Sequence, residues 1–217
     1  MFSNIKTTNK DKRKSLLFSE SGAGNTLIEI IVVIFIIVLF SIILVPDFPK
    51  IKRKFALSRS VYKFAQDLKS VQDMGLSGVL TGGAVQAKGY GVFIDLNNTA
   101  LANKKYIVYA DINGDSKYTS QSSSQINHTC GAQNPGEDCV LEVIDFSVME
   151  NEVIISDIYN VTGNQQISIN FAPPNPNVTI TDLVQGSTEV EIIFAVESDS
   201  SQTRSVFVNT SGLINVQ

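Results

Sequence analysis

Oxygen-bearing side chains alternate in one short stretch of this 217-residue chain. Asp111, Asn113 and Asp115 stand at alternate positions, which is the spacing at which calcium-binding loops present their ligands. The full EF-hand pattern is not met, because Ser116 replaces the usual glycine and Ser122 replaces the carboxylate that closes such a loop. A tight hairpin turn is the competing interpretation, since the Asn-Gly pair in this stretch is a strong turn former. These three residues are the calcium candidates of the sequence.

Two cysteines are the second candidate for side-chain chemistry. Cys130 and Cys139 flank residues 131–138, a polar stretch rich in turn-forming residues. We expect a disulfide between them if this part of the chain lies outside the cytoplasm, and two free thiols otherwise. A cysteine-based metal site is not expected, because His128 is the single additional ligand of a suitable kind nearby.

Catalytic constellations find no support in the sequence. The chain has one histidine, His128, and no nucleophile stands next to it. No glycine-rich phosphate loop lies between a predicted strand and a predicted helix. The carboxylates are scattered, as they are on an ordinary acidic surface. The sequence therefore predicts neither an enzyme nor a bound cofactor.

Charge is distributed unevenly along the chain, although its net value is only −4. Residues 1–24 carry five basic side chains against two acids, and residues 47–70 carry seven against two. Beyond residue 70 there are five basic and sixteen acidic residues. Nucleic-acid binding would need a basic patch, so this acidic portion argues against a nucleic-acid partner.

One apolar run dominates the sequence from Leu27 to Val45, with Glu29 as its single charge. As a helix, nineteen residues extend about 28 Å, close to the hydrocarbon thickness of a bilayer of about 30 Å. A cleaved secretory signal is the alternative, but its apolar region is shorter and a small-residue cleavage site follows it. Here Pro46 follows the run and the small residues 21–24 precede it. We therefore expect a retained membrane anchor.

Glu29 needs an explanation, because a carboxylate inside a membrane-spanning helix is costly unless it is paired or protonated. In one interpretation its side chain simply reaches the membrane surface. In the other, a positive charge at the same depth neutralises it. A free α-amino group, made by cutting the chain just upstream, would supply that charge.

The residues around this run resemble the prepilin signature of type IV pilins and type II secretion pseudopilins. Gly24-Asn25-Thr26-Leu27-Ile28-Glu29 leads into the apolar run and contains its first three residues, and Pro46 follows the run. The resemblance implies that prepilin peptidase cuts between Gly24 and Asn25 and that the new N-terminus at Asn25 is methylated. It further implies that Glu29 sets the register between assembled subunits and that Pro46 loosens the helix.

These features predict four parts and an α+β fold. Residues 1–24 form a basic cytoplasmic leader that is cleaved, and residues 25–46 form the transmembrane and assembly half of a long helix. Residues 47–77 form its amphipathic half, and residues 78–217 form an extracytoplasmic β-rich head. Within about 20 residues of the apolar run there are four basic residues before it and six after it, which alone would favour the opposite orientation. The resemblance to prepilins instead implies a cytoplasmic N-terminus before cleavage and a head outside the cytoplasm.

The amphipathic half is predicted from about residue 50 to residue 74 by apolar residues that recur on one helical face. These residues are Phe55, Val61, Phe64, Ala65, Leu68 and Val71. We expect them to lie against a sheet. Beyond Val79 the period changes to two, which predicts a mostly antiparallel sheet. The predicted strands are Ala84–Lys88, Tyr90–Leu96, Lys105–Ala110, Val140–Phe146, Glu152–Asp157, Gln166–Phe171, Glu189–Glu197, Ser205–Asn209 and Leu213–Val216.

Within the family, the predicted head is most similar to minor pseudopilins and minor pilins of the GspH/FimT type. The residues that carry this similarity are Gln66–Leu68, Tyr90–Phe93, Tyr106–Asp115, Phe171–Pro174 and Arg204–Gly212. The resemblance implies a structural subunit of a type IV pilus or a type II secretion pseudopilus, in a position at the tip or in priming assembly. The implied partners are other pilin or pseudopilin subunits, prepilin peptidase, the inner membrane and the assembly platform. The alternative is an uncleaved, single-pass anchored protein that displays its head for binding or adhesion.

Overall fold

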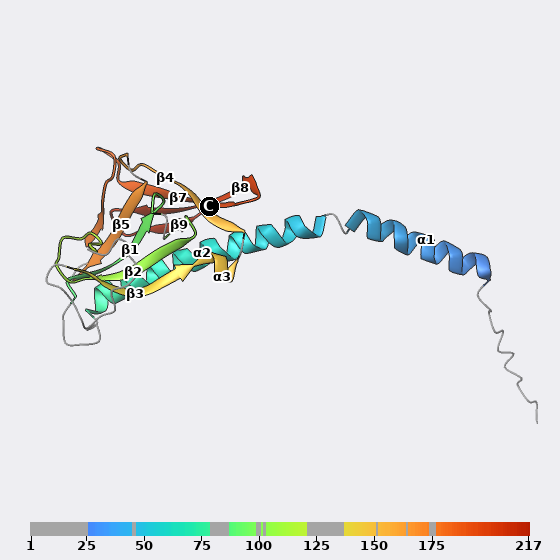
Figure 1. Cartoon of the computed structure of the whole chain (residues 1–217), viewed down its shortest axis with the longest axis horizontal. Helices are drawn as coiled ribbons and strands as arrows, with labels where there is room; N and C mark the ends of the chain where they lie inside the picture. The colour runs from blue at the N-terminus through green and yellow to red at the C-terminus, as the bar shows by residue number, and fades with distance from the viewer. Residues whose placement is uncertain are drawn as a thin grey trace, which may run out of the picture. The chain divides into compact units, whose positions relative to one another are not determined.

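The computed structural model describes residues 26–44, 47–78, 87–98, 101, 103–120, 137–150, 152–163, 165–173 and 177–217 (Figure 1). The leader, Gly24, Asn25, Pro46 and Cys130 lie outside the described residues. Internal contacts divide the chain into two units, Met1–Pro46 and Asp47–Gln217. The helices are α1 (Leu27–Leu44), α2 (Phe48–Ser77) and α3 (Phe146–Met149).

The strands are β1 (Gly89–Asp95), β2 (Lys105–Asp111), β3 (Cys139–Asp145), β4 (Val153–Tyr159), β5 (Gln166–Ala172), β6 (Asn177–Ile180), β7 (Glu189–Val196), β8 (Asp199–Asn209) and β9 (Ile214–Val216). They form two sheets in which every pairing is antiparallel. The five-stranded sheet has the order β3-β2-β1-β5-β6, and the four-stranded sheet has the order β4-β7-β8-β9.

The helix α1 is apolar on all sides, and the part of the chain that the structure describes buries none of its residues. By length and composition it could cross a membrane, as a single span does; a signal sequence near the N-terminus would also have this character. Its one serine, Ser41, donates its hydroxyl hydrogen to the carbonyl oxygen of Ile37 at 2.8 Å. This bond satisfies a polar group that would otherwise be costly to place in hydrocarbon.

The helix α2 has the end signals that its sequence suggests. Pro49 lies in its first turn, where a missing backbone N–H costs no helical hydrogen bond. Gly78 ends the helix in the left-handed conformation, with a φ of 59°, and its N–H donates to the carbonyl oxygen of Met74. Glycine adopts this conformation without the penalty that a Cβ atom imposes. The helix therefore ends at Gly78.

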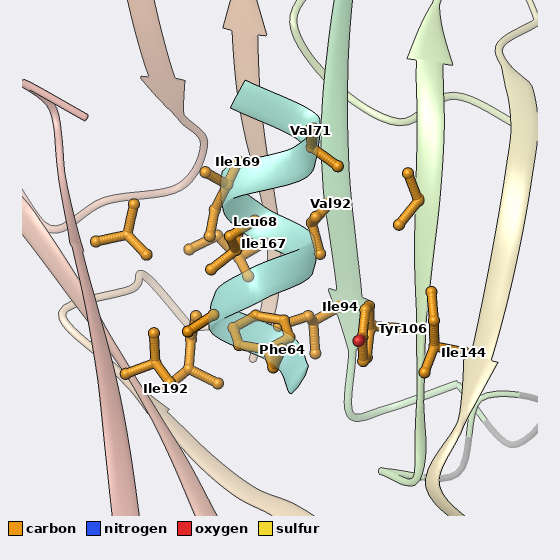
Figure 2. Close-up of a cluster of buried hydrophobic side chains, with 14 of the residues drawn as sticks. Phe64, Leu68, Val71, Val92, Ile94, Tyr106, Ile144, Ile167, Ile169 and Ile192 are labelled. Carbon is orange, nitrogen blue, oxygen red and sulfur yellow. The ribbon is translucent and has the colours of Figure 1, made fainter. Parts of the chain in front are cut away.

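The buried face of α2 packs against strands of both sheets. Figure 2 shows Phe64, Leu68 and Val71 of α2 among buried side chains of the strands. The strand residues labelled there are Val92, Ile94, Tyr106, Ile144, Ile167, Ile169 and Ile192. Burying this many apolar side chains on one helix face is the dominant stabilising contribution in a domain of this size.

The five-stranded sheet is buried on its other face as well. A second apolar cluster joins side chains of β1 and β2 to residues of the following loops. Its buried members are Phe93, Leu101, Ile107, Tyr109 and Tyr118. This cover explains why every residue of β1 is buried, whereas a sheet with one wet face would alternate between buried and exposed residues.

The predicted α+β class, with N-terminal helices and antiparallel sheets, is confirmed, and the differences from prediction are local. The helical region is described as α1 and α2, and residues 45 and 46 between them lie outside the described part. The predicted buried face includes Phe55, which is wrong, because Phe55 is exposed. The periodic pattern predicts a helix end near residue 74, but α2 continues to Ser77.

The sheet predictions differ in three places. The first predicted strand, 84–88, has only residues 87 and 88 within the described part, and these two residues are not in a strand. The short strand β6 and the single-turn helix α3 were not predicted. The strand β8 begins at Asp199, six residues before the predicted start, because it continues directly from the turn that follows β7.

Candidate functional site

The apolar helix α1 is the first candidate site, and Glu29 lies in its first turn. The backbone N–H of Glu29 donates to the carbonyl oxygen of Thr26 at 2.9 Å, so Glu29 takes part in the hydrogen bonds of the first helical turn. Within the described residues, the Glu29 carboxylate has no ion-pair partner. Gly24 and Asn25, the predicted cleavage pair, lie outside those residues, so cleavage and methylation stay predictions.

Three carboxylates form the second candidate site, at one end of the five-stranded sheet. The carboxylate oxygens of Asp111, Asp115 and Asp138 lie within 4.8 Å of one another. Asp111 is the last residue of β2, and Asp138 directly precedes β3; both are buried, whereas Asp115 is exposed. Of the three calcium candidates, the fold thus brings Asp111 and Asp115 together and adds Asp138.

Backbone N–H groups donate hydrogen bonds to the two buried carboxylates. Asp111 accepts from Gly114 at 2.5 Å and from Ser116 at 2.9 Å. Asp138 accepts from Ile112 at 3.0 Å through one oxygen and from Thr119 at 2.7 Å through the other. These bonds fasten the segment before β3 to the loop after β2, so the cluster acts as a clamp on this loop.

Asn113 takes part in the loop rather than in the carboxylate cluster. Its side-chain oxygen accepts from the backbone N–H of Asp115 at 2.8 Å, and its side-chain nitrogen donates to the Asp115 carboxylate at 3.1 Å. The Lys88 ammonium donates to the backbone oxygen of Asn113 at 2.8 Å. The predicted tight hairpin turn is wrong, because β2 pairs with β3, which begins only at Cys139; the Asn-Gly pair instead lies in the loop after β2, with Gly114 at a φ of 83°.

The electrostatics of the cluster reflect burial and crowding of like charges. Burial, together with the neighbouring carboxylates Asp111 and Asp115, raises the pKa of Asp138 to about 6, against the backbone hydrogen bonds that lower it. Burial also raises the pKa of Asp111. A hard cation with oxygen ligands would relieve this repulsion, so the cluster has the chemistry for calcium as well as for clamping.

Sequence reasoning missed Asp138, and no local signal could have found it. Asp138 is 23 residues beyond Asp115 in the chain, and only the pairing of β2 with β3 brings the two together. Next to it, Cys139 is buried and disulfide-bonded. Cys130, the other cysteine of the chain, lies outside the described residues, so the predicted pair stays a prediction.

A groove on the first turns of α2 is the third candidate. It has a volume of about 630 Å³ and is lined by Pro49, Lys52, Arg53, Phe55, Ala56, Arg59, Glu150 and Glu152. Two ion pairs cross it: Arg53 to Glu152 at 2.5 Å and Arg59 to Glu150 at 2.7 Å. Sequence analysis assigned the basic residues of this stretch to a helix but did not predict the groove.

No family model, curated protein or solved structure matches this chain. The function proposed below therefore depends on the residues and on the geometry described above.

Proposed function

We propose that this chain is the precursor of a minor pilin or pseudopilin, a structural subunit of a type IV pilus or a type II secretion pseudopilus. The observation that carries the proposal is that α1 is apolar on all sides and buries no residue within the chain. Eighteen such residues need a surrounding other than water. Lipid provides it before assembly, and the helices of sibling subunits provide it in a filament.

Glu29 gives α1 a second property that suits assembly. A lone carboxylate near the start of an apolar helix is costly in lipid, and it is stabilised by a positive charge at the same depth. Cleavage after Gly24 would create an α-amino group four residues before Glu29. Neutralising this amine, in the same chain or in a neighbour, would set the axial register of the filament.

The location follows from the same proposal. The chain is held in the inner (cytoplasmic) membrane by α1, with a cytoplasmic leader before cleavage and the head outside the cytoplasm, and it then passes into the filament. The disulfide at Cys139 supports an oxidising surrounding for the head. Its partners are prepilin peptidase, the assembly platform and other pilin or pseudopilin subunits. The similarity to the GspH/FimT type supports a position at the tip or in priming assembly.

Processing of the N-terminus tests the proposal. The full chain is expressed with and without a prepilin peptidase, and its N-terminus is measured by mass spectrometry. We expect loss of residues 1–24 and a chain that begins at Asn25, with an added methyl group, only when the peptidase is present. An intact chain under both conditions would contradict the proposal and favour the uncleaved, single-pass display of a binding head.

A further inference from the structure

The first turns of α2 carry an apolar face that the described part of the chain does not cover. Phe48 is 59% exposed, Ile51 48% and Phe55 63%. Their spacing of three and four residues places them on one side of the helix, which we call the stem face. The buried residues of α2 begin only at Leu57, so the stem face lies before the part of the helix that packs on the sheets.

Lysines flank the stem face. At about 100° per residue, Lys52 falls on one side of it and Lys54 on the other. Neither lysine has an ion-pair partner within the described part of the chain. The Lys52 ammonium lies 5.2 Å from the centre of the Phe48 ring. This pattern of exposed aromatic rings and free lysines is typical of helices that lie at a membrane surface.

The arginines of the same stretch have partners of their own. Arg53 is bound by Glu152 and Arg59 by Glu150, so these two positive charges are already neutralised within the chain. The charge left for an external partner is therefore that of the lysines, which flank the apolar rings. Arginines would bind an acidic protein surface as well as lysines do. Free lysines beside exposed apolar side chains instead favour lipid as the partner.

Chain length places this face near the end of α1 whatever the angle between the two helices. Phe48 follows Leu44, the last residue of α1, by four residues, and four extended residues span at most about 14 Å. Phe55 lies about 10 Å further along α2. If α1 crosses the bilayer, as the proposed function requires, Phe48 lies within or next to the headgroup layer.

We propose that residues 47–55 form an interfacial segment that docks on anionic phospholipid headgroups while the subunit resides in the membrane. The stem face enters the boundary between headgroups and acyl chains, and Lys52 and Lys54 bind the lipid phosphates. This inference depends on the membrane anchoring in the proposed function but adds a lipid preference and a second, surface-bound helix segment. It also gives a use to the basic residues that follow the apolar run.

Tryptophan fluorescence can test this docking, because the chain contains no tryptophan. Two variants of the full chain are made, one with Phe48→Trp and one with Phe55→Trp. Each is reconstituted in nanodiscs of phosphatidylcholine, with or without phosphatidylglycerol. Brominated acyl chains quench a tryptophan that reaches them. Leu213→Trp is the control in the head, because Leu213 is exposed and lies far along α2 from the stem face. The backbone oxygen of its neighbour Gly212 accepts a hydrogen bond from Gln72, which is 24 residues beyond Phe48 in the sequence.

We expect quenching of Phe55→Trp to be at least about twofold stronger with phosphatidylglycerol than without it. The negatively charged headgroups attract the lysines and so bring the segment closer to the acyl chains. Adding Lys52→Glu and Lys54→Glu should remove this difference. Lys69→Glu with Lys117→Glu makes the same change in total charge at exposed positions away from the stem face, and should leave the difference intact. The Leu213→Trp control should show no quenching in either membrane.

Three outcomes would overturn the docking proposal. Equal quenching of Phe55→Trp in both membranes, together with strong quenching of Phe48→Trp, means that α1 anchors the chain but the lysines do not select anionic lipid. If the lysine reversals instead weaken self-association and leave quenching unchanged, the occupant of the stem face is a second copy of the chain. If neither tryptophan is quenched and alkaline carbonate extracts the chain from membranes, the anchor itself is absent, and the proposed function fails as well.

Discussion

The Tyr106 hydroxyl donates a hydrogen bond to the Asp67 carboxylate at 2.5 Å, and so joins the middle of α2 to β2. Asp67 also accepts from the Lys63 ammonium one turn earlier on the helix. The Tyr106 ring packs edge-on against Phe64, with ring centres 5.0 Å apart. A polar bond and an aromatic contact thus fix the rotation of α2 about its own axis, which determines which helix face enters the core.

Tyr106→Phe tests this polar bond. We expect the free energy of unfolding to fall by about 1–2 kcal/mol, because the ring is kept while a buried hydrogen bond to a charged group is lost. Urea denaturation of the variant and of the unchanged chain measures the difference. Tyr62→Phe is the matched control, since Tyr62 is exposed on the same helix and should change stability by less than about 0.5 kcal/mol. Equal effects of the two substitutions would contradict the role of Tyr106.

Gly75→Ala tests the close approach of α2 to β5. A Cβ atom at Gly75 would lie 2.6 Å from the backbone oxygen of Phe171, which cannot move without displacing the strand. Alanine normally stabilises a helix interior relative to glycine, so a loss of about 1–3 kcal/mol in unfolding free energy would indicate overpacking.

Ser70→Ala is the control for this substitution, because Ser70 is exposed on α2 and the change also introduces an alanine. Its effect on the free energy of unfolding should be within about 0.5 kcal/mol of zero. If Gly75→Ala stabilises the protein as much as an exposed glycine replacement would, the packing distance between α2 and β5 is larger than described.

The buried carboxylate Asp138 predicts a pH dependence of stability. Burial raises its pKa from 3.8 to about 6, so the folded protein holds this proton more tightly than the unfolded chain does. Its contribution therefore favours folding at acidic pH and is lost as the pH rises from about 4 to about 6. Relative to Asp138→Asn, the unchanged chain should lose on the order of 2 kcal/mol of unfolding free energy over this range.

Urea denaturation at several pH values, in the presence of EDTA, measures this dependence for Asp138→Asn and the unchanged chain. Asp182→Asn, at an exposed site, is the control and should follow the pH profile of the unchanged chain. A constant difference in stability between Asp138→Asn and the unchanged chain at all pH values would show that the buried carboxylate does not titrate in this range.

Calcium titration tests the same cluster as a cation site. The calcium hypothesis predicts that millimolar calcium raises the melting temperature, because an ion that binds only the folded state stabilises it by mass action. Asp115→Asn should remove the shift and leave the fold intact, since Asp115 is the exposed member of the cluster. A melting temperature that calcium leaves unchanged would leave the cluster as a hydrogen-bonded clamp alone.

Glu29→Ala tests the proposed register of the assembled subunit. We expect incorporation into filaments to fall at least about tenfold, which corresponds to losing an interaction of about 1.4 kcal/mol. The melting of the head should not change, because α1 contributes no residue to the core. Glu20→Ala changes an acid in the leader and should assemble normally. Normal assembly of Glu29→Ala would contradict the proposed role of this carboxylate.

The helical pattern predicted most of the α2 core and failed at Phe55, which does not share the buried face of the helix. Phe64 and Leu68 repeat at helical spacing and are buried, because strands lie opposite them. Phe55 lies nine residues before Phe64, which at about 100° per residue places it on the opposite side of the helix, so its side chain stays exposed. Periodicity indicates which residues can share a face; only tertiary structure decides whether anything covers that face.

The alternating pattern predicted where most of the long strands lie, but it did not predict which strands pair with one another. The strand β6 has only four residues, which is too short for alternation to stand out. The acidic cluster required Asp138 to meet Asp111 through the pairing of β2 with β3, and such a contact leaves no trace in local spacing. The calcium pattern in the loop after β2 therefore identified two of its three carboxylates.

The packing of α2 on both sheets has a mechanical consequence. A pull that reaches the head through α1 enters at the N-terminal end of α2, and its component along the helix axis loads the contact with β1, β5, β7, β8 and β9 in shear. Shear spreads such a load over many side chains at once, from Leu57 to Gly75, instead of opening them one after another. The packing of α2 on the sheets therefore resists a pull along the axis of this helix.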